Sequence, residues 1–125
     1  MDSNAENRQE RRFADRWPIW FGHHFTQTVS FGIMEDISSG GLAFTYTDRA
    51  GPLQQGQTLT VRFRLPRFDT PDPNATLVVT RTGFIRWLTA VGNNVYRVGL
   101  KFDAPLSLQP AEEAALTAAF RDAAE

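Results

Sequence analysis

Asp36-Ile37-Ser38-Ser39-Gly40-Gly41 is the stretch that decides the fold, because a β-strand pattern stops there and starts again directly afterwards. Upstream, residues 26–37 are rich in β-branched side chains and partly alternate between apolar and polar. Downstream, residues 41–47 alternate again and place three apolar side chains on one face: Leu42, Phe44 and Tyr46. The sequence therefore predicts a β-hairpin with this stretch as its turn.

The same turn carries side chains that suit a ligand. The carboxylate of Asp36 accepts hydrogen bonds from paired N–H donors, and the hydroxyl of Ser38 donates or accepts. Gly40 and Gly41 allow a positive φ or the close approach of another group to the backbone. An ordinary Asx-type turn uses the same residue types, so the turn alone leaves both interpretations open.

Four further stretches predict strands around this hairpin. Residues 17–21 are densely aromatic, and residues 58–65 alternate so that Leu59, Val61, Phe63 and Leu65 face inward. Residues 76–88 and 96–102 predict a second hairpin across a turn at residues 92–94. Turns containing Gly or Pro separate the strands, which favours a mostly β protein, a small six-stranded antiparallel barrel.

A single helix is predicted near the C-terminus, over about residues 107–124. Pro110 suits the first helical position, and Glu112 and Glu113 lie where acidic side chains interact favourably with the helix dipole. Four residues form the predicted apolar stripe that packs on the barrel: Leu116, Phe120, Ala115 and Ala119.

Composition limits the class of protein. The 125 residues suit one domain, and a net charge of −1 argues against a general polyanion binder. With no cysteine, disulfides, zinc–thiolate sites and thiol catalysis are excluded. The sequence shows neither a signal peptide nor an apolar run long enough to span a membrane, so we expect a cytoplasmic protein.

Residues 1–16 are polar and lack apolar periodicity, so we expect a flexible N-terminal arm, with residues 17–125 forming the barrel and its helix. The arm contains four arginines: Arg8, Arg11, Arg12 and Arg16. Such a segment is either a solvated run of charge or a clamp of guanidinium groups that grips phosphate oxygens and stacks on a base. Charge alone does not choose between the two.

Two motifs, taken together in this order, resemble the PilZ domain, a bacterial receptor module for cyclic di-GMP. Arg12-Phe13-Ala14-Asp15-Arg16 matches the family's R-x-x-x-R pattern, and residues 36–41 match its [D/N]-x-S-x-x-G pattern. Arg16-Trp17-Pro18-Ile19 is similar to the start of the family's first strand, and residues 96–102 are similar to its last strand. The resemblance covers about residues 8–124.

The resemblance implies a role for each motif residue. Arg12 and Arg16 would hold the phosphates and approach the guanines, and Asp36 would accept from the guanine Watson–Crick N–H groups. Ser38 would add a hydrogen bond, and Gly41, beside Gly40, would let a base or the arm approach the backbone. Arg11 precedes the motif where the family's residue bears on stoichiometry, so an intercalated dimer of cyclic di-GMP is a hypothesis. Arg8 would be peripheral, although Arg8 and Arg12 also form an R-x-x-x-R.

By this resemblance the chain is expected to be a receptor that is not an enzyme, in which the ligand orders the arm and creates a surface for a protein partner acting in trans. Motility, attachment and exopolysaccharide synthesis are the processes that the family implies.

No metal, DNA, RNA or membrane insertion is expected. His23 and His24 are adjacent and would point to opposite faces of a strand, which is a poor arrangement for catalysis or a metal. The alternatives are a PilZ-like interaction module without nucleotide binding and a small barrel that binds single-stranded nucleic acid.

Overall fold

The computed structural model describes residues 17–23, 29–47, 53–72 and 74–124, with side chains as far as residue 120. The predicted arm at residues 1–16 lies outside these ranges. Within them the elements are β1 (Pro18–Gly22), β2 (Ser30–Ile37), β3 (Gly41–Thr47), β4 (Thr58–Pro66), β5 (Thr76–Gly92), β6 (Val95–Phe102) and α2 (Pro110–Ala124).

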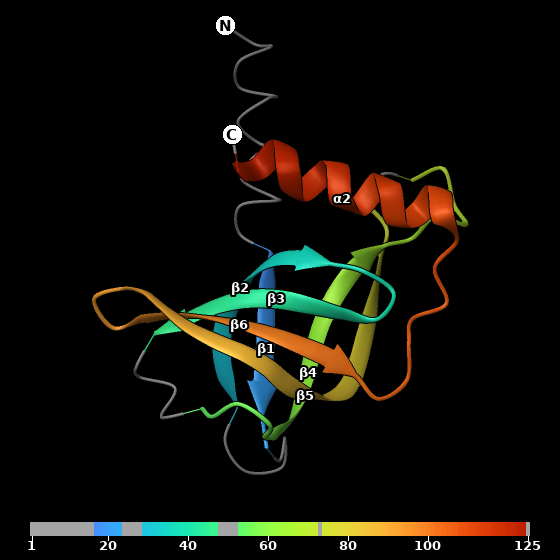
Figure 1. The fold of residues 1–125 in the computed structure, drawn as a ribbon. Coiled ribbons are helices and arrows are strands. Elements are labelled where there is room, and N and C mark those ends of the chain that lie inside the picture. The colour runs from blue at the N-terminus through green and yellow to red at the C-terminus, as the bar shows by residue number, and fades with distance from the viewer. Residues whose placement is uncertain (1–16, 24–28, 48–52, 73, 125) are drawn as a thin grey trace, which may run out of the picture.

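The six strands form a closed barrel in the order β1-β2-β3-β6-β5-β4, and all neighbouring strands are antiparallel. Helix α2 lies across one end of the barrel (Figure 1). The predicted small antiparallel barrel with a C-terminal helix is confirmed.

Alternation along the strands builds the core. The inward residues of β4 are buried as predicted, from Leu59 to Leu65, and so are Leu42, Phe44 and Tyr46 on β3. Phe21 of β1 reaches Phe44 with 4.9 Å between ring centroids, so aromatic contacts join strands across the interior. These side chains fix which face of each strand is outside, and hence where a surface site can lie.

Helix α2 closes the barrel through Leu116 and Phe120, which are buried as predicted. The ring of Phe120 stacks on Trp17 with 4.6 Å between centroids. The side chain of Glu112 caps the start of the helix, because its Oε1 accepts from the backbone amide of Gln109 at 2.9 Å. Ala119 is partly buried against the same core, as predicted, whereas Ala115 is exposed and lies outside the stripe.

Three element boundaries differ from the prediction. Strand β2 starts at Ser30 rather than at residue 26, while residues 26–28 lie outside the described part of the chain. Strand β5 continues to Gly92 because a tight turn at residues 93–94, with φ of 61° at Asn94, extends the pairing to the hairpin tip. The helix starts at Pro110, the residue that the sequence suited to its first position, rather than at about 107.

Candidate functional site

A β-bulge in β2 determines where Asp36 points. Pairing with β3 passes from Met34 opposite Phe44 to Asp36 opposite Ala43, which leaves Glu35 as an extra residue. In a regular strand Asp36 would share the inner face with buried Met34, because side chains repeat every second residue. The bulge instead leaves Asp36 exposed on the outer surface.

A second bulge, in β5, does the same for Trp87. Pairing with β6 passes from Ile85 opposite Leu100 to Trp87 opposite Gly99, so Arg86 is the extra residue. Ile85 is fully buried, whereas Trp87 retains 40% of its accessible surface. A large aromatic side chain that would otherwise face the core is therefore displayed outside.

Both bulges border one open hollow of about 320 Å³. The hollow combines a carboxylate, a hydroxyl, two cations, an indole and exposed glycine backbone. Its polar, charged, aromatic and glycine residues are Asp36, Ser38, Gly40 and Gly41 from the β2–β3 turn, Arg86 and Trp87 from β5, and Gly99 and Lys101 from β6. This set can accept paired N–H donors, stack on a flat ring and neutralise anionic groups.

Hydrogen bonds within the turn hold Asp36 and Ser38 in place. Oδ1 of Asp36 accepts from the amide of Ile37 at 2.9 Å, and among the described residues its Oδ2 has no hydrogen-bond partner. The amide of Ser38 donates to the carbonyl of Gly41 at 2.8 Å, and its hydroxyl lies 3.4 Å from the same oxygen. One oxygen of the carboxylate thus orients the group while the other faces solvent.

The two turn glycines have different roles. A Cβ on Gly41 would lie 2.2 Å from the carbonyl oxygen of Leu100, so Gly41 allows β3 to pair closely with β6. A Cβ on Gly40 would meet nothing within 4 Å. Neither has a positive φ, since among the described glycines that conformation occurs at Gly56. The close approach at Gly41 in this structure is that of β6, and the approach of a base or the arm remains a prediction.

Trp87 is held by contacts with two residues of β6. Its indole covers Gly99, where a Cβ would lie 2.2 Å from two ring atoms. The guanidinium carbon of Arg97 lies 5.9 Å from the ring centroid, within the range of a cation–π interaction. Arg97 in turn forms an ion pair with Glu35 at 3.0 Å, so the bulged residue of β2 steadies the side chain over Trp87.

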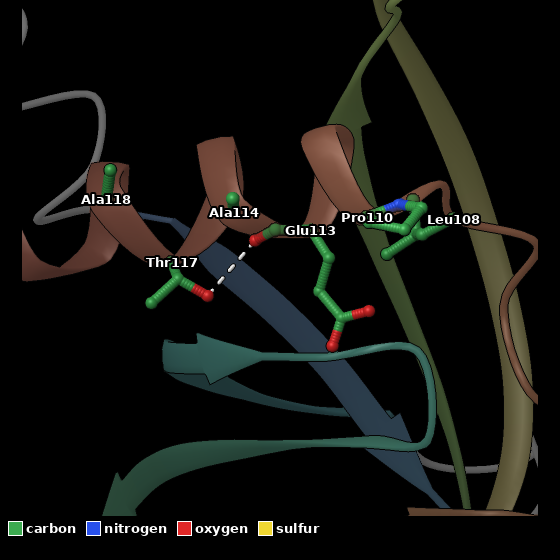
Figure 2. Close-up of a pocket in the computed structure, with 6 residues that line it drawn as sticks. All are labelled: Leu108, Pro110, Glu113, Ala114, Thr117 and Ala118. Atoms are coloured by element: carbon green, nitrogen blue, oxygen red, sulfur yellow. Dashed lines mark hydrogen bonds between the residues drawn. The ribbon is translucent and has the colours of Figure 1, made fainter.

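Ser39 bonds the turn both to helix α2 and to the segment that precedes it. Its carbonyl accepts from the amide of Leu106 at 2.8 Å, and its hydroxyl donates to Oε2 of Glu113 at 2.9 Å. Figure 2 shows the side chain of Glu113 pointing from the helix toward the β2–β3 turn. Glu113 also lines a groove of about 510 Å³ along α2, together with Leu108, Pro110, Ala114, Thr117 and Ala118.

The predicted site residues divide into two groups. The structure brings Asp36, Ser38, Gly40 and Gly41 together, while all four predicted arginines lie outside the described residues: Arg8, Arg11, Arg12 and Arg16. Sequence reasoning missed the contribution of β5 and β6: Arg86, Trp87, Gly99 and Lys101. A glycine inside a strand indicates close approach of another group, and this signal was present at Gly99.

The histidines contribute nothing to this hollow as far as the described residues show. His23 is exposed, and its Nδ1 lies 3.1 Å from the carbonyl oxygen of Thr58, while His24 lies outside the described ranges. The described residues contain no group of His, Asp and Glu side chains placed to hold a metal ion. None of the helices in the described part of the chain is long and apolar enough to cross a membrane.

The fold is similar to that of a solved structure with a TM-score above 0.5. The inhibitor of motility MotI/DgrA of Bacillus subtilis superposes with a TM-score of 0.56 and 16% identity, covering 84% of this chain and 45% of that one. PlzA of Borreliella burgdorferi, solved in complex with c-di-GMP, gives a TM-score of 0.47 and 16% identity over 97% of this chain and 53% of that one. The chain thus spans about half the length of these proteins.

No curated protein sequence matches the chain significantly. The profile of the PilZ domain family, in contrast, matches residues 6–119. This range contains the barrel, both motifs and most of α2. The chain therefore belongs to the PilZ domain family.

Proposed function

We propose that this PilZ domain binds cyclic di-GMP in the hollow between the β2–β3 turn and the β5–β6 hairpin. The observation that carries the proposal is that two independent bulges turn Asp36 and Trp87 outward onto the same hollow. A β-bulge disrupts the ladder locally, and bulges are over-represented next to active sites, where they re-aim a side chain. Here the two re-aimed groups are a carboxylate and an indole, which suit the edge and the face of a guanine.

The chemistry of the hollow fits such a ligand group by group. The solvent-facing Oδ2 of Asp36, with Oδ1, can accept from the two N–H groups on the guanine Watson–Crick edge. Trp87 offers a surface for base stacking, which contributes about 1–3 kcal/mol per base. Arg86 and Lys101 can neutralise phosphate or bind the Hoogsteen edge of guanine.

The predicted arm would complete the site. The carbonyl of Trp17, the first described residue, accepts from the amide of Met34 at 2.7 Å, two positions before Asp36. Trp17 is thus anchored on β2 close to Asp36 in sequence, and Arg12 lies five residues along the chain from that anchor, a reach of at most about 18 Å. These two arginines, with Arg11 and peripherally Arg8, would supply the remaining phosphate contacts.

In this proposal ligand binding orders residues 1–16 over the hollow and changes the surface that a protein partner meets in trans. The link from Ser39 to Glu113 gives the turn a direct connection to α2. The output would be motility, attachment or exopolysaccharide synthesis in the cytoplasm of a bacterium. An intercalated ligand dimer is the proposed bound form, because Arg86 and Lys101 add cations to those of the arm.

Calorimetric titration of cyclic di-GMP tests the proposal, with GMP and cyclic AMP as controls. We expect saturable binding that is abolished by Arg12→Ala and Arg16→Ala and weakened by Asp36→Ala. Trp87→Ala should weaken binding between about fivefold and a hundredfold through lost stacking. A ratio of two ligands per chain supports the dimer, and one per chain contradicts it. If the intact chain binds none, it is a PilZ-like interaction module.

Tryptophan fluorescence gives an independent readout. Trp17 is buried and Trp20 is half-buried, so Trp87 is the most exposed tryptophan of the described chain. Stacking of guanine on its indole should quench the emission, and Trp87→Phe should remove most of the quenching. Quenching that persists in Trp87→Phe would place the ligand elsewhere.

A further inference from the structure

A second feature of the surface lies on strands β1, β2, β4 and β5 and takes no part in the proposed ligand site. Strand register places Trp20 beside Phe31 of β2 on one side and beside Arg62 of β4 on the other. The next outward residue of β4, Arg64, is paired with Val78 of β5. We call this surface the β1–β4 face, formed by Trp20, Val29, Phe31, Arg62, Arg64 and Val78.

The β1–β4 face exposes large apolar side chains side by side. Phe31 retains 56% of its accessible surface, Val78 retains 53% and Val29 retains 41%. Trp20 and Phe31 pack edge to face, with 6.3 Å between their ring centroids. Single exposed apolar residues are ordinary, but a contiguous group with aromatic rings is typical of an interaction surface.

The face is hollowed as well as apolar. A depression of about 300 Å³ is lined by Trp20, Val29, Arg62, Phe63, Arg64 and Val78. Its charged lining residues are Arg62 and Arg64, both basic. Arg62, which lines the depression, donates from Nε to Oγ1 of Thr80 on β5 at 3.3 Å. The β1–β4 face thus combines an apolar depression with two basic side chains.

The position of the face separates it from the ligand site. In the ring order β1-β2-β3-β6-β5-β4, the boundary between β1 and β4 lies opposite the boundary between β3 and β6. The hollow that carries Asp36 is built on β3 and β6 and the adjoining ends of β2 and β5. A molecule bound to the β1–β4 face would therefore leave that hollow accessible.

We propose that the β1–β4 face docks a segment of another protein in which apolar side chains alternate with Asp or Glu. The apolar side chains enter the depression against Trp20 and Val78, and the carboxylates pair with Arg62 and Arg64 at its rim. Aromatic residues and arginine are the types enriched where interfaces concentrate binding energy. This assignment is independent of cyclic di-GMP binding.

The charges favour this occupant over two others. A symmetric contact with a second copy of the chain would bring Arg62 and Arg64 of both copies into one interface, where like charges repel. An anionic membrane gains only about 1 kcal/mol per basic residue near its surface, which is too little for two arginines. A depression of this size also suits inserted side chains better than a flat lipid surface.

The test selects short random peptides displayed on phage against the full-length protein and measures the selected peptides by fluorescence anisotropy. We expect selected peptides to combine Asp or Glu with Leu, Phe or Trp. Affinity should fall at least roughly tenfold in Arg64→Glu and in Val78→Asp. Val91→Asp is the matched control, because Val91 is also on β5 and is 51% exposed but lies outside the face.

Each other result overturns the proposal. The docking assignment is wrong if no peptides are enriched, or if the enriched peptides lack acidic residues. It is also wrong if they bind Val78→Asp as well as the parent protein. Sedimentation showing a dimer that Val78→Asp dissociates would assign the face to a second copy. Flotation with phosphatidylglycerol vesicles that depends on Arg62 and Arg64 would assign it to a membrane.

Discussion

Gly41 and Gly40 are neighbours in the same turn, yet replacing each with alanine should have opposite effects. A Cβ at position 41 would lie 2.2 Å from the carbonyl oxygen of Leu100 and 3.3 Å from the Cα of Lys101. These are backbone atoms of β6, so no side-chain rotation relieves the contact. A Cβ at position 40 would have no atom within 4 Å, and the φ there is not positive.

The magnitude follows from how far the strands must separate. Contacts below 3.0 Å essentially never occur, so Gly41→Ala requires β3 and β6 to move apart by about 0.8 Å at this pair. A hydrogen bond stretched by that amount is lost, and overpacking adds its own strain. We expect the free energy of unfolding to fall by about 2–4 kcal/mol. Gly40→Ala should leave it unchanged or raise it by about 0.4–1 kcal/mol.

Urea denaturation followed by circular dichroism measures both variants. With a slope of about 2 kcal/mol per M, the midpoint of Gly41→Ala should fall by about 1–2 M. That of Gly40→Ala should stay level or rise by less than about 0.5 M. The reasoning is refuted if Gly41→Ala unfolds within about 0.3 M of the parent chain, or if Gly40→Ala is as destabilised as Gly41→Ala.

Three further predictions concern the parts around the hollow. Gly99→Ala should displace the indole of Trp87, shift its fluorescence and weaken cyclic di-GMP binding by about tenfold. The urea midpoint should change less than in Gly41→Ala, because the side chain of Trp87 can move aside whereas the backbone of β6 cannot. Arg97→Met should lower ligand affinity several-fold by calorimetry, yet alter the free energy of unfolding by less than about 1 kcal/mol, because its ion pair with Glu35 is partly exposed to solvent. An unchanged affinity would deny Arg97 a role in positioning Trp87. Ser39→Ala should speed amide hydrogen exchange at the start of α2 by about tenfold, because the hydrogen bond to Glu113 is lost. Ser39→Thr keeps the hydroxyl and should not speed exchange. Equal exchange rates in the two variants would contradict the link between the turn and α2.

The strands could be predicted because their sequences alternate clearly. Residues 58–65 place every second side chain in the core, and the structure buries those residues. The hairpin of β2 and β3 could be predicted for a similar reason, because a turn built of small and acidic residues separates two apolar patterns. Where the pattern was irregular, as at the ends of β2 and β5, the predicted boundaries were wrong by several residues.

The site was only half predictable. Asp36 and Ser38 were identified from their motif, but the sequence gives no register, and a bulge is a property of two paired strands. The extra residues Glu35 and Arg86 cannot be recognised without knowing which residues face them. Trp87 could consequently be taken for a core aromatic. The arginines of the arm remain a prediction, because they lie outside the described part of the chain.

The closed ring of strands restricts how any other molecule can engage this domain. Each of the six strands has a neighbour on both sides, and most of their N–H and C=O groups are paired across the ring. The exception is the far end of β5, because its pairing with β4 ends at Phe84 while the strand continues to Gly92. A partner that joins by β-augmentation, which relies on an unpaired edge and is tolerant of sequence, is therefore restricted to short stretches such as this one. Elsewhere recognition depends on particular side chains projecting from a fixed scaffold. Exchanging a few of these residues should redirect the domain to a different partner while the barrel itself stays the same.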